Sequence, residues 1–267
     1  MRLDPTAAAA GFRLAVHDVL GSTNSEALTQ SRRGEKGPLW VVAREQTAGR
    51  GRRGREWISA PGNLYATLLL FDPAPAETAP QLAFVTGLAV FDAIVDCAGD
   101  LREGLALKWP NDVLYANRKF AGILIESELA AAKLVVAIGI GVNCVRHPAQ
   151  TSFPATDLAE AGKKVSPESL FYALSHAMMR RLDQWRRGSG FAAIRSDWLE
   201  CSTGIGGDIA VRLSGRDLSG HFENLDDGGR LLLRLPDGKL QMIMAGDIFP
   251  VAERAPVVSL LPKKRTD

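Results

Sequence analysis

The sequence predicts an α+β fold with two domains, over residues 12–201 and 204–252. In the first domain, short apolar runs with strand character are interspersed with segments of helical spacing. From about residue 202, short strands alternate with turns such as "SGRDLSG", "DDGG" and "PDG", which is typical of a small barrel. Residues 1–11 are expected to be a disordered lead-in and residues 253–267 a solvated tail.

Strands are expected where apolar, β-branched and aromatic residues form short runs bounded by turn residues. The segments are 12–20, 39–46, 63–71, 105–115, 119–129 and 133–144. Along the last of these, period-two alternation places Ala137, Gly139, Gly141 and Asn143 on one strand face. Three of these residues are small, so either a ligand lies flat against the backbone or a helix packs closely there.

Helices are expected between these strands. The stretch "GSTN" (21–24) offers N-cap residues for a helix over about 25–32. Residues 81–98 carry apolar side chains near helical spacing. "SPE" at 166–168 supplies a cap, a proline at the first helical position and an acidic first turn. A second helix is expected over 191–200.

Composition excludes several classes of protein. The net charge of +2 gives no reason to expect nucleic acid or a membrane surface as a partner. Cys97, Cys144 and Cys201 lie far apart, which fits reduced thiols in a cytoplasm. The four histidines lack metal-ligand spacing. There is no signal segment, and no run approaches the roughly 18 apolar residues of a membrane span.

Residues 49–55, "GRGRRGR", match the dinucleotide-binding spacing G-x-G-x-x-G. A dinucleotide turn needs a helix directly after the third glycine. Here "REWISAPGN" follows and a strand resumes at Leu64, so the context is strand–loop–strand and the match fails. Four arginines suit phosphate or carboxylate instead, because guanidinium groups bind both in bidentate geometry. The alternative is a solvated basic loop.

Two further stretches carry positive charge. "KWPNDVLY" places Lys108, Asn111 and Asp112 around a proline turn after a strand. A carboxylate beside an amide and an ammonium suits Mg²⁺ with phosphate oxygens. "NRKFAGILIE" adds Lys119 at the start of the next strand. The alternative for each lysine taken alone is a surface charge.

Five motifs in order, "GSTN", "EQTAGRGRRGREW", "KWPNDV", "RKFAGIL" and "GIGVN", resemble those of the biotin–protein ligases. The resemblance covers about residues 12–200, and residues 204–252 match the family's small C-terminal domain. It implies a class II synthetase-like mixed sheet flanked by helices, followed by an SH3-like β-barrel.

The resemblance also implies a biotin site. Its residues are Ser22, Thr23, Asn24, Gln46, Gly49, Arg50, Gly51, Arg52, Lys119, Gly122, Gly139 and Gly141. Residues 22–24 with Gln46 would contact the ureido end of biotin. The loop containing Arg50, Gly51 and Arg52 would close over biotin and the adenylate.

An ATP site follows from the same resemblance. Its residues are Arg52, Arg55, Trp57, Asn111, Asp112, Lys119 and Asn143, with Asp112 nearest to Mg²⁺. Trp57 would close over adenine, and Lys119 would reach the carboxyl and the α-phosphate. The resemblance assigns catalysis to Lys119, Arg50, Arg52 and Lys108.

The implied reaction has two steps. The biotin carboxylate attacks the α-phosphate of ATP, giving biotinyl-5′-AMP and pyrophosphate, and a lysine of a biotin carboxyl carrier protein then displaces AMP. ATP, Mg²⁺ and biotin act as substrates or activator, with no permanently bound cofactor. We expect a cytoplasmic protein that contacts no membrane, and leave a homodimer open. Eleven residues cannot hold the winged helix-turn-helix of many relatives, so no DNA binding is expected.

Two other functions compete with this interpretation. A lipoate–protein ligase shares the fold and the adenylate chemistry, although "GRGRRGR" together with "KWPND" favours biotin. A non-catalytic nucleic-acid-binding module would use the arginine loop and the basic tail. It leaves Gly139 and Gly141 unexplained.

Overall fold

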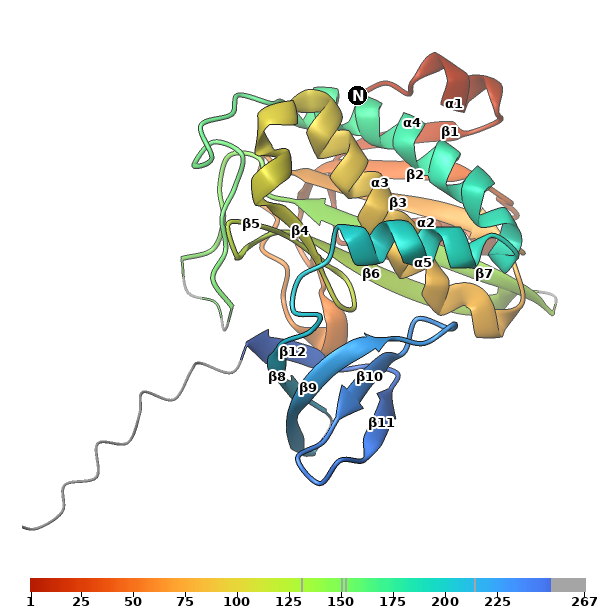
Figure 1. The fold of residues 1–267 in the computed structure, drawn as a ribbon. Helices are drawn as coiled ribbons and strands as arrows, with labels where there is room; N and C mark the ends of the chain where they lie inside the picture. Colours follow the sequence, from red (N-terminus) through yellow and green to blue (C-terminus); the bar gives the residue numbers. More distant parts are fainter. Residues whose placement is uncertain (131, 150, 152, 214, 251–267) are drawn as a thin grey trace, which may run out of the picture.

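The computed structural model describes residues 1–250, except 131, 150, 152 and 214. A larger α+β domain is followed by a smaller β domain that lies against one end of it (Figure 1). The tail predicted over 253–267 falls outside the described residues, as do the last two residues of the predicted C-terminal domain.

The larger domain is built on a seven-stranded sheet with the order β1-β2-β3-β7-β6-β5-β4. The strands are β1 (Arg13–Leu20), β2 (Leu39–Gln46), β3 (Leu64–Phe71), β4 (Leu105–Lys108), β5 (Asp112–Tyr115), β6 (Arg118–Ala130) and β7 (Lys133–Val142). β1 and β2 are parallel and the other pairs are antiparallel, which confirms a mixed sheet. The segment predicted as one strand over 105–115 is two strands, because the turn at 109–111 reverses the chain.

Helices cover both faces of this sheet. α3 (Leu82–Cys97), α4 (Pro167–Trp185) and α5 (Phe191–Glu200) lie on one face, over the main hydrophobic core (Figure 1). α2 (Thr23–Arg32) lies on the opposite face, where its Ala27 packs with the strand residues Val135 and Ala137. Period-two alternation along β7 therefore directs 136, 138, 140 and 142 to the core and 137, 139 and 141 to the α2 side.

The prediction of a disordered lead-in over 1–11 is wrong. Pro5–Ala9 form a short helix, α1, which Asp4 caps by accepting from the Thr6 backbone N–H at 2.8 Å. The backbone N–H of Asp4 donates to Ser175 Oγ of α4 at 2.9 Å, and Ala7 is fully buried. This segment has no apolar periodicity of its own, so its order depends on a helix that is distant in sequence.

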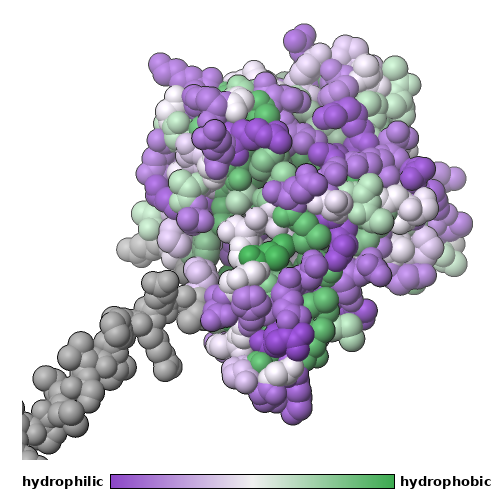
Figure 2. Space-filling model, in the orientation of Figure 1, coloured by the Kyte–Doolittle hydropathy of each residue, from purple (hydrophilic) through white to green (hydrophobic). Residues whose placement is uncertain are grey.

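Contrary to the expectation from the sequence, one segment is long and apolar enough to span a membrane by length and composition. It runs from Ala76 to Cys97 and comprises the short 3-10 helix η2 (Ala76–Gln81) and α3. However, 72% of its most apolar stretch is buried inside the protein, as in a core helix. Hydrophilic residues cover much of the face that carries α3, α4 and α5, with hydrophobic ones gathered between the two domains and on the smaller one (Figure 2).

The smaller domain is an antiparallel sheet with the order β11-β10-β9-β8-β12. Its strands are β8 (Asp208–Arg212), β9 (Asp217–Leu225), β10 (Leu231–Arg234), β11 (Leu240–Ile243) and β12 (Asp247–Pro250). Its apolar residues join the core of the larger domain, and Trp109 Nε1 donates to the Gly229 carbonyl at 3.1 Å. Phe249 of β12 lies next to the end of β4, with its ring centre 5.9 Å from Lys108 Nζ.

Candidate active site

A cavity of about 400 Å³ lies on the α2 side of the large sheet and extends to β12 of the smaller domain. The predicted site residues that line it are Ser22, Thr23, Asn24, Gln46, Arg50, Gly51, Arg52, Arg55, Trp57, Lys108, Asn111, Asp112, Lys119, Gly122, Gly139, Gly141 and Asn143. Gly49 does not line it. A Cβ there would lie 2.4 Å from the Trp57 carbonyl oxygen and 2.5 Å from Ser59 Oγ, so only glycine fits.

One end of the cavity is a network of neutral groups. The backbone N–H and the hydroxyl of Thr23 both donate to Gln46 Oε1, at 2.8 and 3.0 Å. Gln46 Nε2 donates to Ser59 Oγ at 2.9 Å. The buried Thr67 hydroxyl lies 2.8 Å from Thr23 Oγ1 and 2.7 Å from Asn24 Oδ1. Each amide here has a fixed orientation, because its carbonyl oxygen and its NH₂ face different partners.

Two side chains of the protein occupy the space above the glycines of β7. A Cβ at Gly139 would lie 2.5 Å from Asn24 Oδ1, and one at Gly141 would lie 2.5 Å from the Trp57 indole. A Cβ at Gly122 of β6 would lie 3.0 Å from the same ring. Close packing of α2 therefore explains Gly139, whereas at Gly141 the group against the backbone is a loop side chain that lines the cavity.

Trp57 lies where the sequence placed biotin, against Gly141 and Gly122, although we predicted it to cover adenine. Its Nε1 atom is buried and has no hydrogen-bond partner among the described residues. Lys119 Nζ lies 5.4 Å from the centre of the same ring, so Trp57 lies between the two ends of the cavity. Its indole N–H is an unsatisfied donor that a ligand acceptor can meet.

The other end of the cavity is charged. The Asp112 carboxylate forms ion pairs with Lys119 Nζ at 2.6 Å and with Lys108 Nζ at 3.5 Å. Burial raises the pKa of the Asp112 carboxyl, but the two ammonium groups outweigh this and hold it below its usual value. Burial lowers the pKa of Lys108, and Asp112 opposes that shift. The ammonium of Lys108 also lies 4.6 Å from the ring centre of Phe153 and 5.9 Å from that of Phe249.

The two asparagines at this end position the backbone around the cavity. Asn111 Nδ2 donates to the Ile123 carbonyl at 2.6 Å, and Asn111 Oδ1 accepts from Arg52 at 3.1 Å. Asn143 Nδ2 donates to the Thr156 carbonyl at 3.0 Å and is buried. Asn111 thus connects β6 to the arginine loop, and Asn143 holds the segment that follows β7.

The surroundings of Asp112 do not fit a resident Mg²⁺ ion. Its carboxylate already neutralises Lys108 and Lys119, and Mg²⁺ requires hard oxygen ligands free to coordinate it. Among the described residues, no three His, Cys, Asp or Glu side chains form a group that could hold a metal.

The arginine loop is a strand–loop–strand connection, as predicted. After β2 it contains one 3-10 turn, η1 (Arg52–Gly54), and the next regular element is β3. Arg52, Arg53 and Arg55 converge on Asp247 at the start of β12, at 3.6, 3.5 and 3.2 Å. Burial lowers the pKa of Arg52, and Asp247 opposes that shift. One carboxylate of the smaller domain therefore holds this end of the loop.

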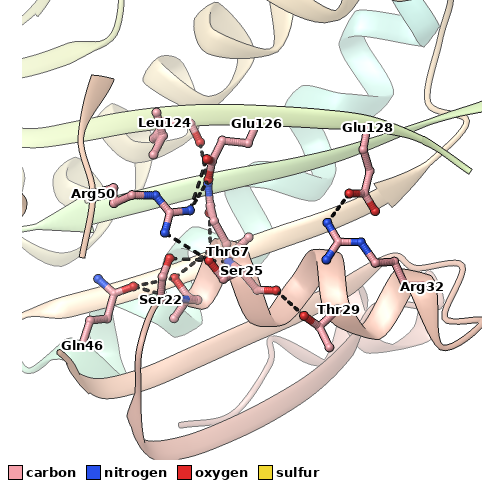
Figure 3. Close-up of polar contacts among 12 residues, drawn as sticks. Ser22, Ser25, Thr29, Arg32, Gln46, Arg50, Thr67, Leu124, Glu126 and Glu128 are labelled. Atoms are coloured by element: carbon pink, nitrogen blue, oxygen red, sulfur yellow. Dashed lines mark hydrogen bonds and ion pairs between the residues drawn. The ribbon is translucent and has the colours of Figure 1, made fainter. Parts of the chain in front are cut away.

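Arg50 points away from the other arginines. Its guanidinium donates to Ser25 Oγ at 3.1 Å and to both carboxylate oxygens of Glu126, each at 3.2 Å (Figure 3). The loop is thus anchored by a carboxylate at each end, Glu126 on β6 and Asp247 on β12.

Several site residues were missed from the sequence: Thr67, Glu126, Phe153, Asp247 and Phe249. Only Thr67 carried a signal, as the single polar residue in the apolar run of β3. Arg55 and Asp247 are 192 residues apart, so no local pattern connects them.

Comparison with known proteins agrees with this geometry. Residues 17–143 match the biotin/lipoate A/B protein ligase family, and residues 204–249 match the biotin protein ligase C-terminal domain. The chain is 42% identical to the biotin–[acetyl-CoA-carboxylase] ligase of Paracoccus denitrificans, over 85% of this chain and 96% of that protein. The chain belongs to the biotin protein ligase family.

Other members of the family agree in sequence and fold. The bifunctional ligase/repressor BirA of Bacillus subtilis is 33% identical, over 89% of this chain and 74% of its own length. The biotin protein ligase of Aquifex aeolicus in complex with biotin and ATP superimposes with a TM-score of 0.73 at 29% identity, over 89% of this chain and 97% of that one. The match to the C-terminal domain of biotin protein ligases favours this family over the lipoate ligases.

Proposed function

We propose that this protein is an ATP-dependent biotin–protein ligase, which activates biotin to biotinyl-5′-AMP and transfers it to a lysine of a biotin carboxyl carrier protein. One observation carries the proposal. A single cavity joins a neutral hydrogen-bonding end to a cluster of lysines and arginines, in a chain 42% identical to a biotin–[acetyl-CoA-carboxylase] ligase. A ureido group suits the first end, and a triphosphate suits the second.

In the first step, the biotin carboxylate forms a bond to the α-phosphorus and the bond to pyrophosphate breaks. Lys119 and Lys108 supply two ammonium groups against the one carboxylate of Asp112, so positive charge remains for the phosphates. Arg52 adds a guanidinium from the loop. Placing cations where charge develops is the main way in which proteins accelerate phosphoryl chemistry. Mg²⁺ enters this scheme with ATP, as part of the substrate.

In the second step, the neutral amine of the carrier lysine attacks the acyl carbon. An amide forms, the acyl–phosphate bond breaks, and AMP leaves with release of one proton. No acyl-enzyme is required, because the adenylate is already activated. The chain needs only to hold the adenylate and to admit the lysine.

The aromatic side chains divide between the two ends. Trp57 lies on Gly141 and Gly122, so we assign its ring to biotin. Phe153 and Phe249 line the cavity beside Lys108, with ring centres 6.4 Å apart, and we assign the adenine to this side. The contact of Trp57 with adenine that was expected from the sequence is the alternative assignment.

Biotin-dependent exchange of pyrophosphate into ATP tests the proposal. The purified protein should catalyse exchange with biotin, and should then label an isolated carrier domain. Exchange that requires lipoate in place of biotin would support the alternative ligase. No exchange with either acid would overturn the proposal. The cytoplasmic location, the homodimer and the absence of DNA binding stay predictions.

A further inference from the structure

Glu126 joins three segments of the chain at the neutral end of the cavity (Figure 3). It lies on β6, and its Oε2 accepts from Asn24 Nδ2 in the first turn of α2 at 2.8 Å. Both of its oxygens accept from Arg50 in the loop after β2. The same guanidinium also donates to Ser25 Oγ. One carboxylate therefore sets the distance between the helix and the loop.

The contact to Asn24 fixes the orientation of a buried amide. Asn24 Nδ2 donates to Glu126 and lies 3.3 Å from the Leu124 carbonyl, while Oδ1 faces the Thr67 hydroxyl. Through Thr67 this orientation reaches Thr23. If the amide turned over, its NH₂ would face Thr67 and its carbonyl would face two acceptors, leaving buried polar atoms unpaired.

The contact to Arg50 fixes the start of the loop. Arg50 directly follows Gly49, whose backbone is packed against Ser59, and it forms an isolated β-bridge with Glu56. The side chains of Arg50 and Glu126 are 39% and 31% exposed, so their ion pair is screened and adds little to the stability of the fold. Its contribution is therefore to geometry.

We propose that Glu126 is a positioning residue of the biotin site. It holds the Asn24 amide and the Arg50 guanidinium in the places where each forms part of the biotin pocket. The inference rests on the proposed function. A carboxylate is required because two donors share it: each of its oxygens can accept a hydrogen bond. Glu126 Oε2 accepts from both Asn24 and Arg50, and Oε1 accepts from Arg50. A carboxamide has one acceptor oxygen, so in Glu126→Gln an NH₂ group would face the Arg50 guanidinium even when the remaining oxygen stays with Asn24.

Glu128 provides a matched control. It lies two residues further along β6, on the same face, and its carboxylate pairs with Arg32 at the end of α2 (Figure 3). Glu128→Gln makes the same chemical change, on the same strand and against the same helix. It leaves the contacts of Asn24 and Arg50 intact.

Calorimetric titration of biotin, beside thermal melting, tests the proposal on the wild type, Glu126→Gln and Glu128→Gln. Glu126→Gln should weaken biotin binding about ten-fold, the effect of one lost charge-assisted hydrogen bond, while Glu128→Gln changes it less than about two-fold. In the exchange assay, Glu126→Gln should raise the KM for biotin and leave kcat within about two-fold. Glu126→Asp, which keeps both oxygens, should recover part of the affinity.

Equal affinities for Glu126→Gln and the wild type would overturn the inference. Equal weakening by Glu128→Gln would do so as well, because it would show that any loss of charge on this face has the same effect. If the wild type itself fails to bind biotin, the proposed function is at fault. The wild-type titration therefore separates the two failures.

Discussion

The two ends of the cavity differ in the groups that line them: hydrogen-bonded neutral side chains at one end and cations paired with carboxylates at the other. At the biotin end, the neutral side chains of Thr23, Asn24 and Gln46 are held by hydrogen bonds, Thr23 to Gln46 and Asn24 to Thr67, and the Arg50–Glu126 pair lies behind them. At the phosphate end, Lys108 and Lys119 are paired with Asp112, and three loop arginines with Asp247. Groups of the first kind can stay in place when a ligand binds. Groups of the second kind must exchange an internal carboxylate for a phosphate.

This difference follows from what each end binds. A neutral, planar ureido group needs dipoles in fixed directions, and preorganised dipoles need no rearrangement at the moment of binding. A triphosphate needs several cations, which repel one another and lose hydration when they are partly buried. Asp112 and Asp247 offset that cost in the ligand-free protein. The comparison therefore predicts separable effects for mutations at the two ends.

The largest effect is expected at Lys119. Lys119→Ala removes the cation closest to Asp112 and, by our assignment, the one beside the α-phosphate. Exchange activity should fall about a thousand-fold, the upper range for loss of one charge-stabilising donor. Biotin binding, measured by calorimetry, should fall far less. Near-wild-type exchange in a folded mutant would remove Lys119 from the mechanism.

The next effect is expected at the biotin end. Gly141→Val adds a side chain that begins 2.5 Å from the Trp57 ring, so the indole must leave its place against β7. Biotin affinity should fall about a hundred-fold, because overpacking a wall costs up to about 3 kcal/mol. Gly99→Val, at a site with no atom within 4 Å, is the control for the general effect of such a change. A large loss of thermal stability with unchanged affinity would show that Gly141 serves packing alone.

A smaller effect is expected for the loop. Arg52 donates to Asn111 Oδ1 and to the Gly246 carbonyl, and so connects the loop to both domains. Losing one charge-assisted contact in Arg52→Gly should speed escape of the adenylate about ten- to a hundred-fold. The mutant would then label lysines on an unrelated protein mixed with ATP and biotin. If labelling per adenylate formed equals that of the wild type, Arg52 does not retain the intermediate.

The smallest effect is a shift in pH dependence. Burial lowers the pKa of Lys108 and the Asp112 charge raises it, so Asp112→Asn should lower that pKa further. Lys108 would then lose its proton at a lower pH, and the KM for ATP would start to rise at a lower pH than in the wild type. The KM for biotin should show no such shift. An unchanged alkaline limb for ATP would mean that Lys108 does not bind the phosphates.

Local patterns in the sequence predicted most of the fold. Ser166 caps α4 through the Ser169 N–H, and Leu39–Gln46 form β2 within the predicted bounds, because caps and alternation act over a few residues. The helix α1 was missed because it depends on Ser175, which is 171 residues away. Nothing in the short, alanine-rich segment 1–11 indicates that it packs against α4.

In the site, too, contacts between residues distant in sequence could not be predicted. Motif spacing identified the cations, but their partners Asp247 and Glu126 come from other strands and only the folded chain brings them together. Trp57 lines the cavity, as predicted, and its expected contact with adenine stays a prediction. The Trp57 ring fits against Gly141 and Gly122 because neither residue has a side chain. These two glycines are neighbours only once β6 pairs with β7.

The salt dependence of the biotin-dependent exchange reaction tests the difference between the two ends most directly, because one assay gives the KM for both substrates. The account predicts that the KM for ATP rises about ten-fold or more between low and about 0.5 M salt, since salt screens the attraction between the triphosphate and a cluster of cations that includes the partly exposed Arg53 and Arg55. The KM for biotin should change less than about three-fold, because neutral hydrogen-bonding groups line most of its end and the Arg50–Glu126 pair there is already a compensated ion pair. A KM for biotin that rises in parallel with that for ATP would contradict the account.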